Sequence, residues 1–332
     1  MTRPRIWVLL GARTGDNNQA LALAETLGLH FEVKQLDYNR LQALSVWLPP
    51  TAATLTAAAK EGLKAPWPDL VIAIGRRSVP VARWIKKQSG GNTKLVRIGH
   101  PRIDPKLFDL VITTRQYPVP PGDNVVLLPV AMSRFVDPPV PTEAERGFLE
   151  RMGNFRLFAI GGATKYWRMP EDALLKVIAR AELLTEKTPL SVVVATSRRT
   201  PGGLVNKIKA LAISDARFAV VDGPSPRFAV LLNAADQIFV TGDSVSMISE
   251  AVLTGKPVAI IPIEQDDKGR KKLGDVPQER GPDARRRDLR RFWNYLIEND
   301  MVGTPDTAPK AAAEIPNPNR IAADAVLTLL GR

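Results

Sequence analysis

The residues with the clearest capacity for chemistry lie in the segment 239–262, where two short apolar runs flank a helical pattern. Its candidate ligand-binding residues are Asp243, Ser244, Ser246, Met247, Ser249 and Glu250. Free N–H groups at a helix start favour a phosphate, and a carboxylate two turns along can accept hydrogen bonds from both hydroxyls of a ribose. The segment therefore predicts a nucleotide site. The alternative is that Asp243 and Ser244 are ordinary helix caps and that Glu250 is a solvated side chain.

Two other polar turns directly follow apolar runs of the C-terminal half. The first offers Gly161, Gly162, Thr164 and Lys165, and the second offers Ser197, Arg198, Arg199 and Thr200. Glycines at a strand end let backbone amides approach a phosphate closely, and paired guanidiniums suit a diphosphate. The first turn lacks the spacing of a Walker loop. A solvated basic turn is the alternative for the second.

The N-terminal half offers two candidates for a general base. Gly11 and Gly15 allow a tight loop after the apolar run 6–10, and the helix start that follows carries the polar residues Asp16, Asn17 and Gln19. Asp16 is the first candidate, with an N-cap as its alternative role. His100, in the turn Gly99-His100-Pro101, is the second candidate, with a structural role as the alternative.

Composition narrows the chemistry. The 332 residues include no cysteine and two histidines, which excludes disulfides, thiol nucleophiles and metal sites built on cysteine or on several histidines. We expect no metal and no cofactor. The formal net charge of +12 attracts anions. No nucleic-acid-binding motif is found, so nucleic acid is not an expected partner. The basic stretch 268–291 suggests contact with an anionic membrane, with a solvated basic face as the alternative.

Apolar runs and helical patterns alternate along the chain, which is the α/β signature. We expect strands at 6–10, 31–35, 70–74, 95–98, 110–113, 125–129, 157–160, 191–195, 218–221, 237–240 and 258–262. Helices are expected at 17–27, 78–88, 170–186, 201–212, 226–234, 244–254 and 285–298, with Thr142 and Glu145 as a capping box for one more. The apolar side of 285–298 is interpreted as core.

These elements predict two Rossmann-like domains that face a cleft. We assign 1–138 to an acceptor-side domain and 139–305 to a nucleotide-sugar domain, separated by the Pro-rich stretch 137–142. Residues 306–332 are expected as a tail or helix that packs back on the first domain. No apolar run is long enough to span a bilayer and no signal peptide precedes Ile6, so a cytoplasmic protein, peripheral at the inner membrane face, is expected.

The motifs resemble the bacterial and plant family named for a plant mitochondrial-fission protein, the Elm type. Its markers are Gly15-Asp-Asn-Asn-Gln19, Ile160-Gly-Gly162, Thr196-Ser-Arg-Arg-Thr-Pro201 and Thr241-Gly-Asp-Ser-Val-Ser-Met-Ile-Ser-Glu250, in a resemblance that runs from Trp7 to about Pro305. Bacterial members of this family are regarded as candidate glycosyltransferases. The resemblance implies the glycosyltransferase-B architecture. Where such families commonly follow the first glycine with a lysine or an acidic residue, this chain has Ala12-Arg13.

The C-terminal half is also similar to the donor half of the lipid-linked peptidoglycan N-acetylglucosaminyltransferases. There a Ser/Glu pair binds the diphosphate and ribose of a uridine nucleotide sugar, and Ser249-Glu250 matches that pair by its spacing to Gly255 and Pro257. This comparison implies a metal-free transfer from a UDP-linked sugar. The net charge of +12 and the basic stretch 268–291 suggest a cell-envelope glycan or a lipid-linked molecule as the acceptor. Two alternatives remain: a non-catalytic adaptor on the same fold, and a nucleotide-sugar epimerase.

Overall fold

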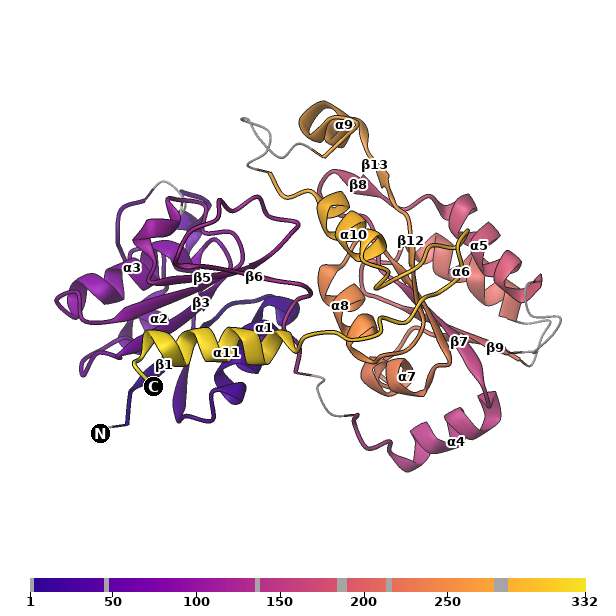
Figure 1. Cartoon of the computed structure of the whole chain (residues 1–332), viewed down its shortest axis with the longest axis horizontal. Helices are drawn as coiled ribbons and strands as arrows, with labels where there is room; N and C mark the ends of the chain where they lie inside the picture. The colour runs from indigo at the N-terminus through magenta and orange to yellow at the C-terminus, as the bar shows by residue number, and fades with distance from the viewer. Residues whose placement is uncertain (1–2, 45–47, 135–137, 184–189, 213–216, 278–285) are drawn as a thin grey trace. The chain divides into compact units, whose positions relative to one another are not determined.

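A computed structural model describes residues 3–44, 48–134, 138–183, 190–212, 217–277 and 286–332. The chain forms two compact units (Figure 1). Unit 1 consists of Met1–Arg134 and Pro316–Arg332, and unit 2 of Phe135–Ile315. The chain therefore leaves unit 1 after Arg134 and returns to it for its last helix.

Unit 1 is built on a six-stranded parallel sheet with the order β2-β1-β3-β4-β5-β6. Its strands are β1 Ile6–Leu10, β2 Phe31–Gln35, β3 Leu70–Ile74, β4 Lys94–Ile98, β5 Leu110–Thr114 and β6 Val125–Leu128. Its helices are α1 Thr14–Thr26, α2 Ala57–Glu61, α3 Ser78–Gln88 and α11 Pro318–Leu329, with short 3-10 turns at Arg40–Leu44 and Pro105–Leu107.

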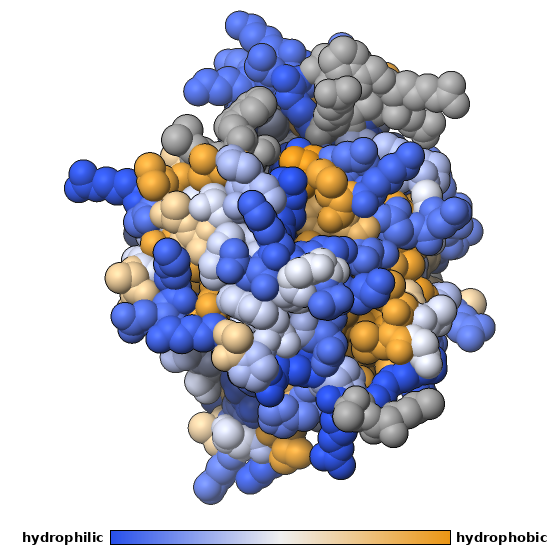
Figure 2. Space-filling view, turned by 90° about the vertical axis from the view of Figure 1, so that its left-hand side faces the viewer, coloured by the Kyte–Doolittle hydropathy of each residue, from blue (hydrophilic) through white to orange (hydrophobic). Residues whose placement is uncertain are grey.

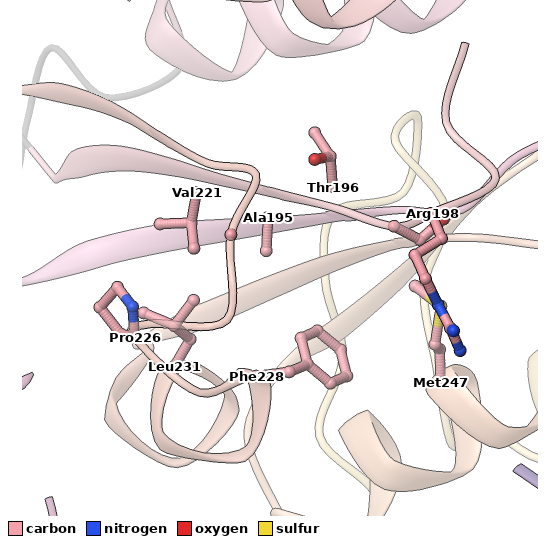
Figure 3. Close-up of a pocket in the computed structure, with 10 residues that line it drawn as sticks. Ala195, Thr196, Arg198, Val221, Pro226, Phe228, Leu231 and Met247 are labelled. Carbon is pink, nitrogen blue, oxygen red and sulfur yellow. The ribbon is translucent and has the colours of Figure 1, made fainter. Parts of the chain in front are cut away.

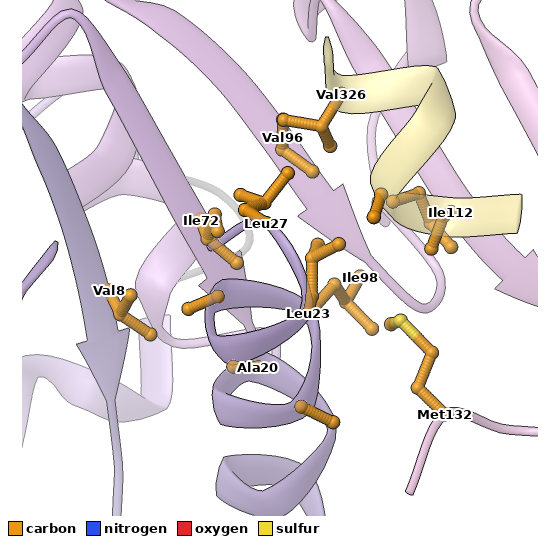
Figure 4. Close-up of a cluster of buried hydrophobic side chains, with 14 of the residues drawn as sticks. Val8, Ala20, Leu23, Leu27, Ile72, Val96, Ile98, Ile112, Met132 and Val326 are labelled. Carbon is orange, nitrogen blue, oxygen red and sulfur yellow. The ribbon is translucent and has the colours of Figure 1, made fainter. Parts of the chain in front are cut away.

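Helices cover both faces of this sheet because its strands are apolar on both sides. Along β1, Val8 belongs to the core beneath α1 and α11, whereas Trp7 and Leu9 belong to the core on the other face. Figure 4 shows Leu23 of α1 and Val326 of α11 directed toward the strands of the first core. The C-terminal helix thus completes the core of unit 1.

Unit 2 is built on a five-stranded parallel sheet with the order β10-β9-β7-β11-β12. Its strands are β7 Phe155–Ile160, β9 Ser191–Thr196, β10 Phe218–Val221, β11 Gln237–Thr241 and β12 Val258–Ile261, with a small antiparallel pair of β8 Trp167–Arg168 and β13 Glu264–Gln265. Its helices are α4 Glu143–Met152, α5 Glu171–Leu183, α6 Gly202–Ala212, α7 Phe228–Ala234, α8 Val245–Leu253, α9 Asp267–Leu273 and α10 Leu289–Glu298.

All eleven predicted strands are confirmed to within two residues at either end, as is the Thr142–Glu145 capping box. Three details are wrong. The helix α1 begins at Thr14, so Gly15 and Asp16 lie inside its first turn and neither Asp16 nor Asn17 is its cap. The helices α5, α6 and α7, expected to begin at Pro170, Pro201 and Pro226, begin one or two residues after these prolines. The pair β8 and β13 is not predicted, because two-residue strands carry no periodicity.

Two predicted helix ends lie outside the described residues. The proposed end of α5 at residue 186 and the proposed start of α10 at residue 285 both fall there. In the described part, α10 begins at Leu289 with Asp288 as its N-cap. Leu289, Phe292, Trp293 and Leu296 are buried, which confirms the interpretation of this helix face as core.

The surface agrees with the strong charge of the sequence. Figure 2 shows mainly hydrophilic side chains on the face that it presents, with apolar side chains in separate groups.

Candidate functional site

The predicted ligand-binding residues of unit 2 lie at the carboxyl edge of its sheet. The strands β7, β9 and β11 are adjacent and parallel, so the turns that follow them meet at one edge. Arg199 after β9 forms an ion pair of 2.6 Å with Asp243 after β11. Thr200 donates a hydrogen bond of 2.7 Å to the Gly161 carbonyl after β7. Three segments that are far apart in the sequence thus form one structure.

Asp243 is the centre of this structure, and its side chain is fully buried. Its carboxylate accepts hydrogen bonds from the Thr241 hydroxyl (2.6 Å) and the Gly162 amide (3.2 Å), besides the Arg199 ion pair. The cap of α8 is Ser244, whose Oγ accepts from the Met247 amide at 3.3 Å. Asp243 therefore joins the three turns and is not placed to meet a ligand, which corrects its prediction as a ligand-binding residue.

The Gly161-Gly162 turn has a different role from the one expected. The Gly161 amide donates to the Thr241 hydroxyl at 2.8 Å and the Gly162 amide donates to Asp243, so both amides are already satisfied. A Cβ at Gly161 would overlap the Asp243 carboxylate, and one at Gly162 would overlap the Arg199 carbonyl. These glycines allow the turns to pack closely, and the expectation that their amides approach a phosphate is corrected.

The rest of that turn is more open. The Thr164 amide donates to the Trp167 carbonyl at 3.0 Å, and the Thr164 hydroxyl is buried without a hydrogen-bond partner. Lys165 is exposed, with its Nζ 4.9 Å from the centre of the Tyr166 ring. Of the four predicted residues, Lys165 is the one that presents a charge to solvent.

The two arginines of the turn after β9 have different surroundings. Thr200 accepts a hydrogen bond from the Ser197 amide at 2.9 Å, which closes the turn, and Arg199 is held by Asp243. Arg198 is exposed and forms no ion pair with a described carboxylate. Arg198 is consequently the cation of this turn that is available to a ligand.

A pocket of about 300 Å³ opens beside this turn, entirely within unit 2. Its lining residues are Ala195, Thr196, Ser197, Arg198, Val221, Gly223, Pro226, Phe228, Leu231 and Met247. Figure 3 shows Arg198 and Met247 at one end and Val221 and Pro226 at the other, with the Phe228 ring between them. The pocket thus combines an aromatic and aliphatic interior with a polar end that carries a guanidinium.

The apolar half of this lining is not predicted from the sequence. Phe228, the first residue of α7, and Leu231 follow β10, whose carboxyl end lies at the same sheet edge as that of β9. The topological rule that strand ends meet would have directed attention to an aromatic residue there. Trp293 of α10, which the sequence predicts as core, also supports the site, since its Nε1 donates to the Gly242 carbonyl at 2.9 Å.

The predicted pair Ser249 and Glu250 lies in helix α8, where the two side chains have different environments. Ser249 is fully buried and its hydroxyl donates to the Val245 carbonyl at 2.7 Å, so it is directed into the helix and its core. Glu250 is mostly buried and has no hydrogen-bond or ion-pair partner among the described residues, and burial raises its pKa to about 7. Met247, which lines the pocket, lies one turn before Glu250 on the same side of α8. Ser246 is half-buried in the first turn.

The candidates in the N-terminal half belong to unit 1. Asn17 holds Gly11 from both sides, since its Oδ1 accepts from the Gly11 amide (3.0 Å) and its Nδ2 donates to the Gly11 carbonyl (2.7 Å). Asp16 lies in the first turn of α1 and Gln19 lies one turn later, and both side chains are half-buried. The loop is thus fixed by Asn17, with Asp16 beside it.

His100 lies after β4 in the same unit. Its Nδ1 accepts a hydrogen bond of 2.8 Å from the Arg102 amide. Burial and the positive charges of Arg102 and Arg97 lower the pKa of His100 to about 4. His100 is therefore neutral near pH 7 and a weak base.

Two features are absent from the part of the chain that the structure describes. No helix there combines the length and apolar character needed to cross a bilayer. No group of three or more His, Asp or Glu side chains there is arranged to hold a metal ion.

Comparison with known proteins identifies relatives across most of the chain. The model of a family described as mitochondrial fission ELM1 matches residues 14–279. The mitochondrial fission protein ELM1 of Arabidopsis thaliana is 28% identical over 71% of this chain and 62% of its own length. The protein RP120 of Rickettsia prowazekii is 26% identical over 77% of this chain and 82% of its own length.

Solved structures share the fold at low sequence identity. A UDP-GlcNAc 2-epimerase from Neisseria meningitidis, bound to UDP-GlcNAc, aligns with a TM-score of 0.53 and 14% identity over 99% of this chain and all of its own. Spinosyn forosaminyltransferase aligns with a TM-score of 0.50 and 15% identity over 99% of this chain and all of its own. The predicted α/β class with two Rossmann-like units of glycosyltransferase-B type is confirmed.

Proposed function

The chain belongs to the mitochondrial fission ELM1 family, and from this premise we propose that it transfers a sugar from a nucleoside-diphosphate sugar, UDP-linked, to a hydroxyl acceptor. The observation that carries the proposal is the pocket of unit 2, which joins the Phe228 ring to the available guanidinium of Arg198. A nucleobase has a flat apolar face that suits an aromatic and aliphatic interior.

The remaining parts of the donor fit around this pocket. The diphosphate would meet Arg198, Lys165 and the first turn of α8, which supplies free amides and the positive end of the helix dipole. The ribose hydroxyls would donate to Glu250, one turn beyond Met247. These groups supply the charge that a departing diphosphate needs, so the proposed transfer uses no metal.

In the transfer step, the acceptor oxygen forms a bond to the anomeric carbon while the bond from that carbon to the diphosphate oxygen breaks. The nucleoside diphosphate leaves with the electron pair of the broken bond, and a base takes the proton of the acceptor hydroxyl. Asp16 is the first candidate for this base and His100 the second, both in unit 1. The low pKa of His100 makes it a weaker base than an ordinary histidine.

The test is a thermal-shift titration of the full chain with nucleoside diphosphates and nucleotide sugars, without added metal. We expect a saturable rise in melting temperature with one nucleotide, and a loss of affinity of about tenfold or more in Arg198→Ala and in Glu250→Gln. The exposed Arg151→Ala and Glu150→Gln on α4 are matched controls and should bind as the wild type does. Equal binding by all four variants would refute this donor site.

The name of the Arabidopsis relative favours a second candidate, a non-catalytic adaptor that uses the fold for protein binding. This candidate requires a folded protein with no affinity for any nucleotide sugar. The bound UDP-GlcNAc of the Neisseria structure favours a third, epimerisation of the donor sugar. NMR of the products separates the third candidate from transfer. An epimerase inverts a stereocentre of the sugar and leaves the sugar on the nucleotide, whereas a transferase moves the sugar to the acceptor and releases the nucleoside diphosphate.

We further propose a cytoplasmic protein that acts on a glycan or lipid-linked acceptor at the inner face of a membrane. The basic stretch 268–291 supports this in part: Lys268, Arg270, Lys271 and Lys272 of α9 are exposed. Arg290 has an internal role, because it donates to the Asp275 carbonyl (2.6 Å) and pairs with Asp288 (2.8 Å). Sedimentation with anionic vesicles, reduced when the three lysines become glutamine, tests the proposal; equal binding to neutral vesicles would refute it.

A further inference from the structure

A buried arginine lies at the other sheet. Arg97 of β4 in unit 1 is 2% exposed. Its guanidinium donates to the Gly75 carbonyl (3.0 Å), the Ser78 hydroxyl (3.2 Å) and the His100 carbonyl (3.0 Å), which are all neutral oxygens. Its Nε is buried without a hydrogen-bond partner. Burying a cation is costly. The hydrogen bonds of Arg97 go to neutral oxygens, and Asp16 is a described carboxylate whose charge acts on it.

More cations surround this position. The Arg77 guanidinium lies 5.9 Å from the Tyr38 ring and the Arg102 guanidinium lies 6.0 Å from the Tyr117 ring. Tyr38 and Tyr117 both act electrostatically on Arg97, as does Asp16. The two exposed arginines and the buried one therefore belong to one local cluster. The low pKa of His100, caused in part by Arg102 and Arg97, is consistent with a positive potential there.

The cluster is part of a larger asymmetry of charge. The strands β1, β3, β4 and β5 are adjacent and parallel, so their carboxyl ends share one edge. The first six residues after each strand include five exposed arginines, Arg13, Arg76, Arg77, Arg102 and Arg115. The same segments include two carboxylates, Asp16 and Asp104, and Asp104 caps a 3-10 turn by accepting from the Lys106 amide.

We propose that this edge of unit 1 binds a phosphate group, as a monoester or diphosphate, with Arg97 at its base and Arg76, Arg77 and Arg102 at its rim. Several guanidiniums around one position suit an anion with more than one charge and several acceptor oxygens. A phosphate group meets this description, whereas a single carboxylate carries one charge and two oxygens. That this phosphate belongs to the acceptor rests on the function proposed above; the anion site itself does not.

Calorimetric titration of the full chain with inorganic pyrophosphate at low salt tests the site. In Arg76→Gln/Arg102→Gln, which changes two exposed side chains and leaves the core intact, the dissociation constant should rise about tenfold or more. Lys87→Gln is the matched control, because Lys87 is exposed at the end of α3, which leads to the opposite edge of the same sheet. This control should bind pyrophosphate as the wild type does.

Arg198→Gln separates this site from the donor site of unit 2. A loss of pyrophosphate binding in Arg198→Gln alone would overturn the inference and leave the proposed function standing. Absence of binding by the wild type, or an equal loss in Lys87→Gln, would overturn it as well. Binding that depends on Arg76 and Arg102 in a protein with no affinity for nucleotides would support the anion site and refute the transferase proposal.

The source of the phosphate follows from competition. Displacement of pyrophosphate by glucose 1-phosphate, lost in Arg76→Gln/Arg102→Gln, would support a soluble phosphate ester. Displacement by vesicles that contain phosphatidic acid, and not by neutral vesicles, would support a lipid headgroup with the same chemistry. Failure of both competitors, with pyrophosphate still bound, would overturn the claim that the edge recognises a phosphate group within a larger molecule.

Discussion

Glu250 is a mostly buried carboxyl group whose environment favours its neutral form. Burial raises its pKa from 4.5 to about 7. Below about pH 4.5 the group is protonated in both the folded and unfolded states, so it has no effect on stability there. Between these two pKa values the unfolded state loses the proton first, so the free energy of unfolding falls as pH rises, by roughly 3 kcal/mol at most above pH 7.

Glu250→Gln should remove this pH dependence because glutamine does not ionise. Urea denaturation should find the variant about as stable as the wild type at pH 4.5 and more stable at pH 8. Glu150→Gln changes an exposed side chain and should leave the pH profile unaltered. A Glu250→Gln protein that is less stable than the wild type at pH 8 would contradict the assigned environment.

Ser249 and Glu250 should differ sharply in their effect on nucleotide binding. Ser249 is fully buried and donates within α8, so Ser249→Ala should change nucleotide affinity less than about twofold. At pH 8, above the pKa of about 7 of Glu250, Glu250→Gln should lower the affinity by about tenfold, because a charge-assisted hydrogen bond is replaced by a neutral one. The measurement is a titration of both variants with the nucleotide that shifts the wild type. A larger effect for Ser249→Ala would mean that Ser249 does contribute to nucleotide binding.

The sequence predicts which residues gather at the site better than what each one does. Residue type and the rule that strand ends meet are enough to select Arg198 and Asp243. The role of each residue depends on contacts across the sheet edge: Asp243 forms an ion pair with Arg199 and none with Arg198. Those contacts join residues 44 positions apart, which no local pattern records.

At the scale of elements, the buried strands are predictable because each is a continuous apolar run bounded by turn residues. The starts of helices are harder to predict from the sequence. Arg13 and Thr14 give no capping signal, since Arg13 holds the N-cap position without a side-chain hydrogen bond. Asp16 and Asn17 are typical capping residues and draw the predicted start three positions too far along the chain.

The turn after β7 provides a prediction at this scale. Gly161→Ala places a Cβ where the Asp243 carboxylate lies, so the three turns can no longer pack together. We expect a loss of at least about 3 kcal/mol in the free energy of unfolding, measured by urea denaturation. In α6, a Cβ added at Gly203 would meet no atom within 4 Å, so Gly203→Ala should be neutral or slightly stabilising. Equal stability of the two variants would contradict the packing described.

The whole molecule is organised by a chain that starts and ends in unit 1. The sequence suggests a boundary near residue 138 and a tail from 306, and the structure divides the chain after Arg134 and again after Ile315. Composition alone does not distinguish these positions, because the segments around both are polar and rich in proline. What fixes the second boundary is the burial of Ala322, Ala323 and Val326 in the core of unit 1.

Because α11 completes the core of unit 1, a substitution that disrupts α11 should destabilise the N-terminal strands of the same unit. Val326→Asp puts a charge into a fully buried apolar site between α11 and the sheet, which should cost more than about 3 kcal/mol. Hydrogen exchange should then show faster exchange in β1, α1 and β5, more than 200 residues away in sequence, while β7, β9 and β11 stay protected. Thr328→Asp, at an exposed position of the same helix, is the control and should leave both units protected. Faster exchange in both units of the Val326→Asp protein would mean that they unfold as one, because unit 2 contains no part of α11 and would lose protection only through a shared transition.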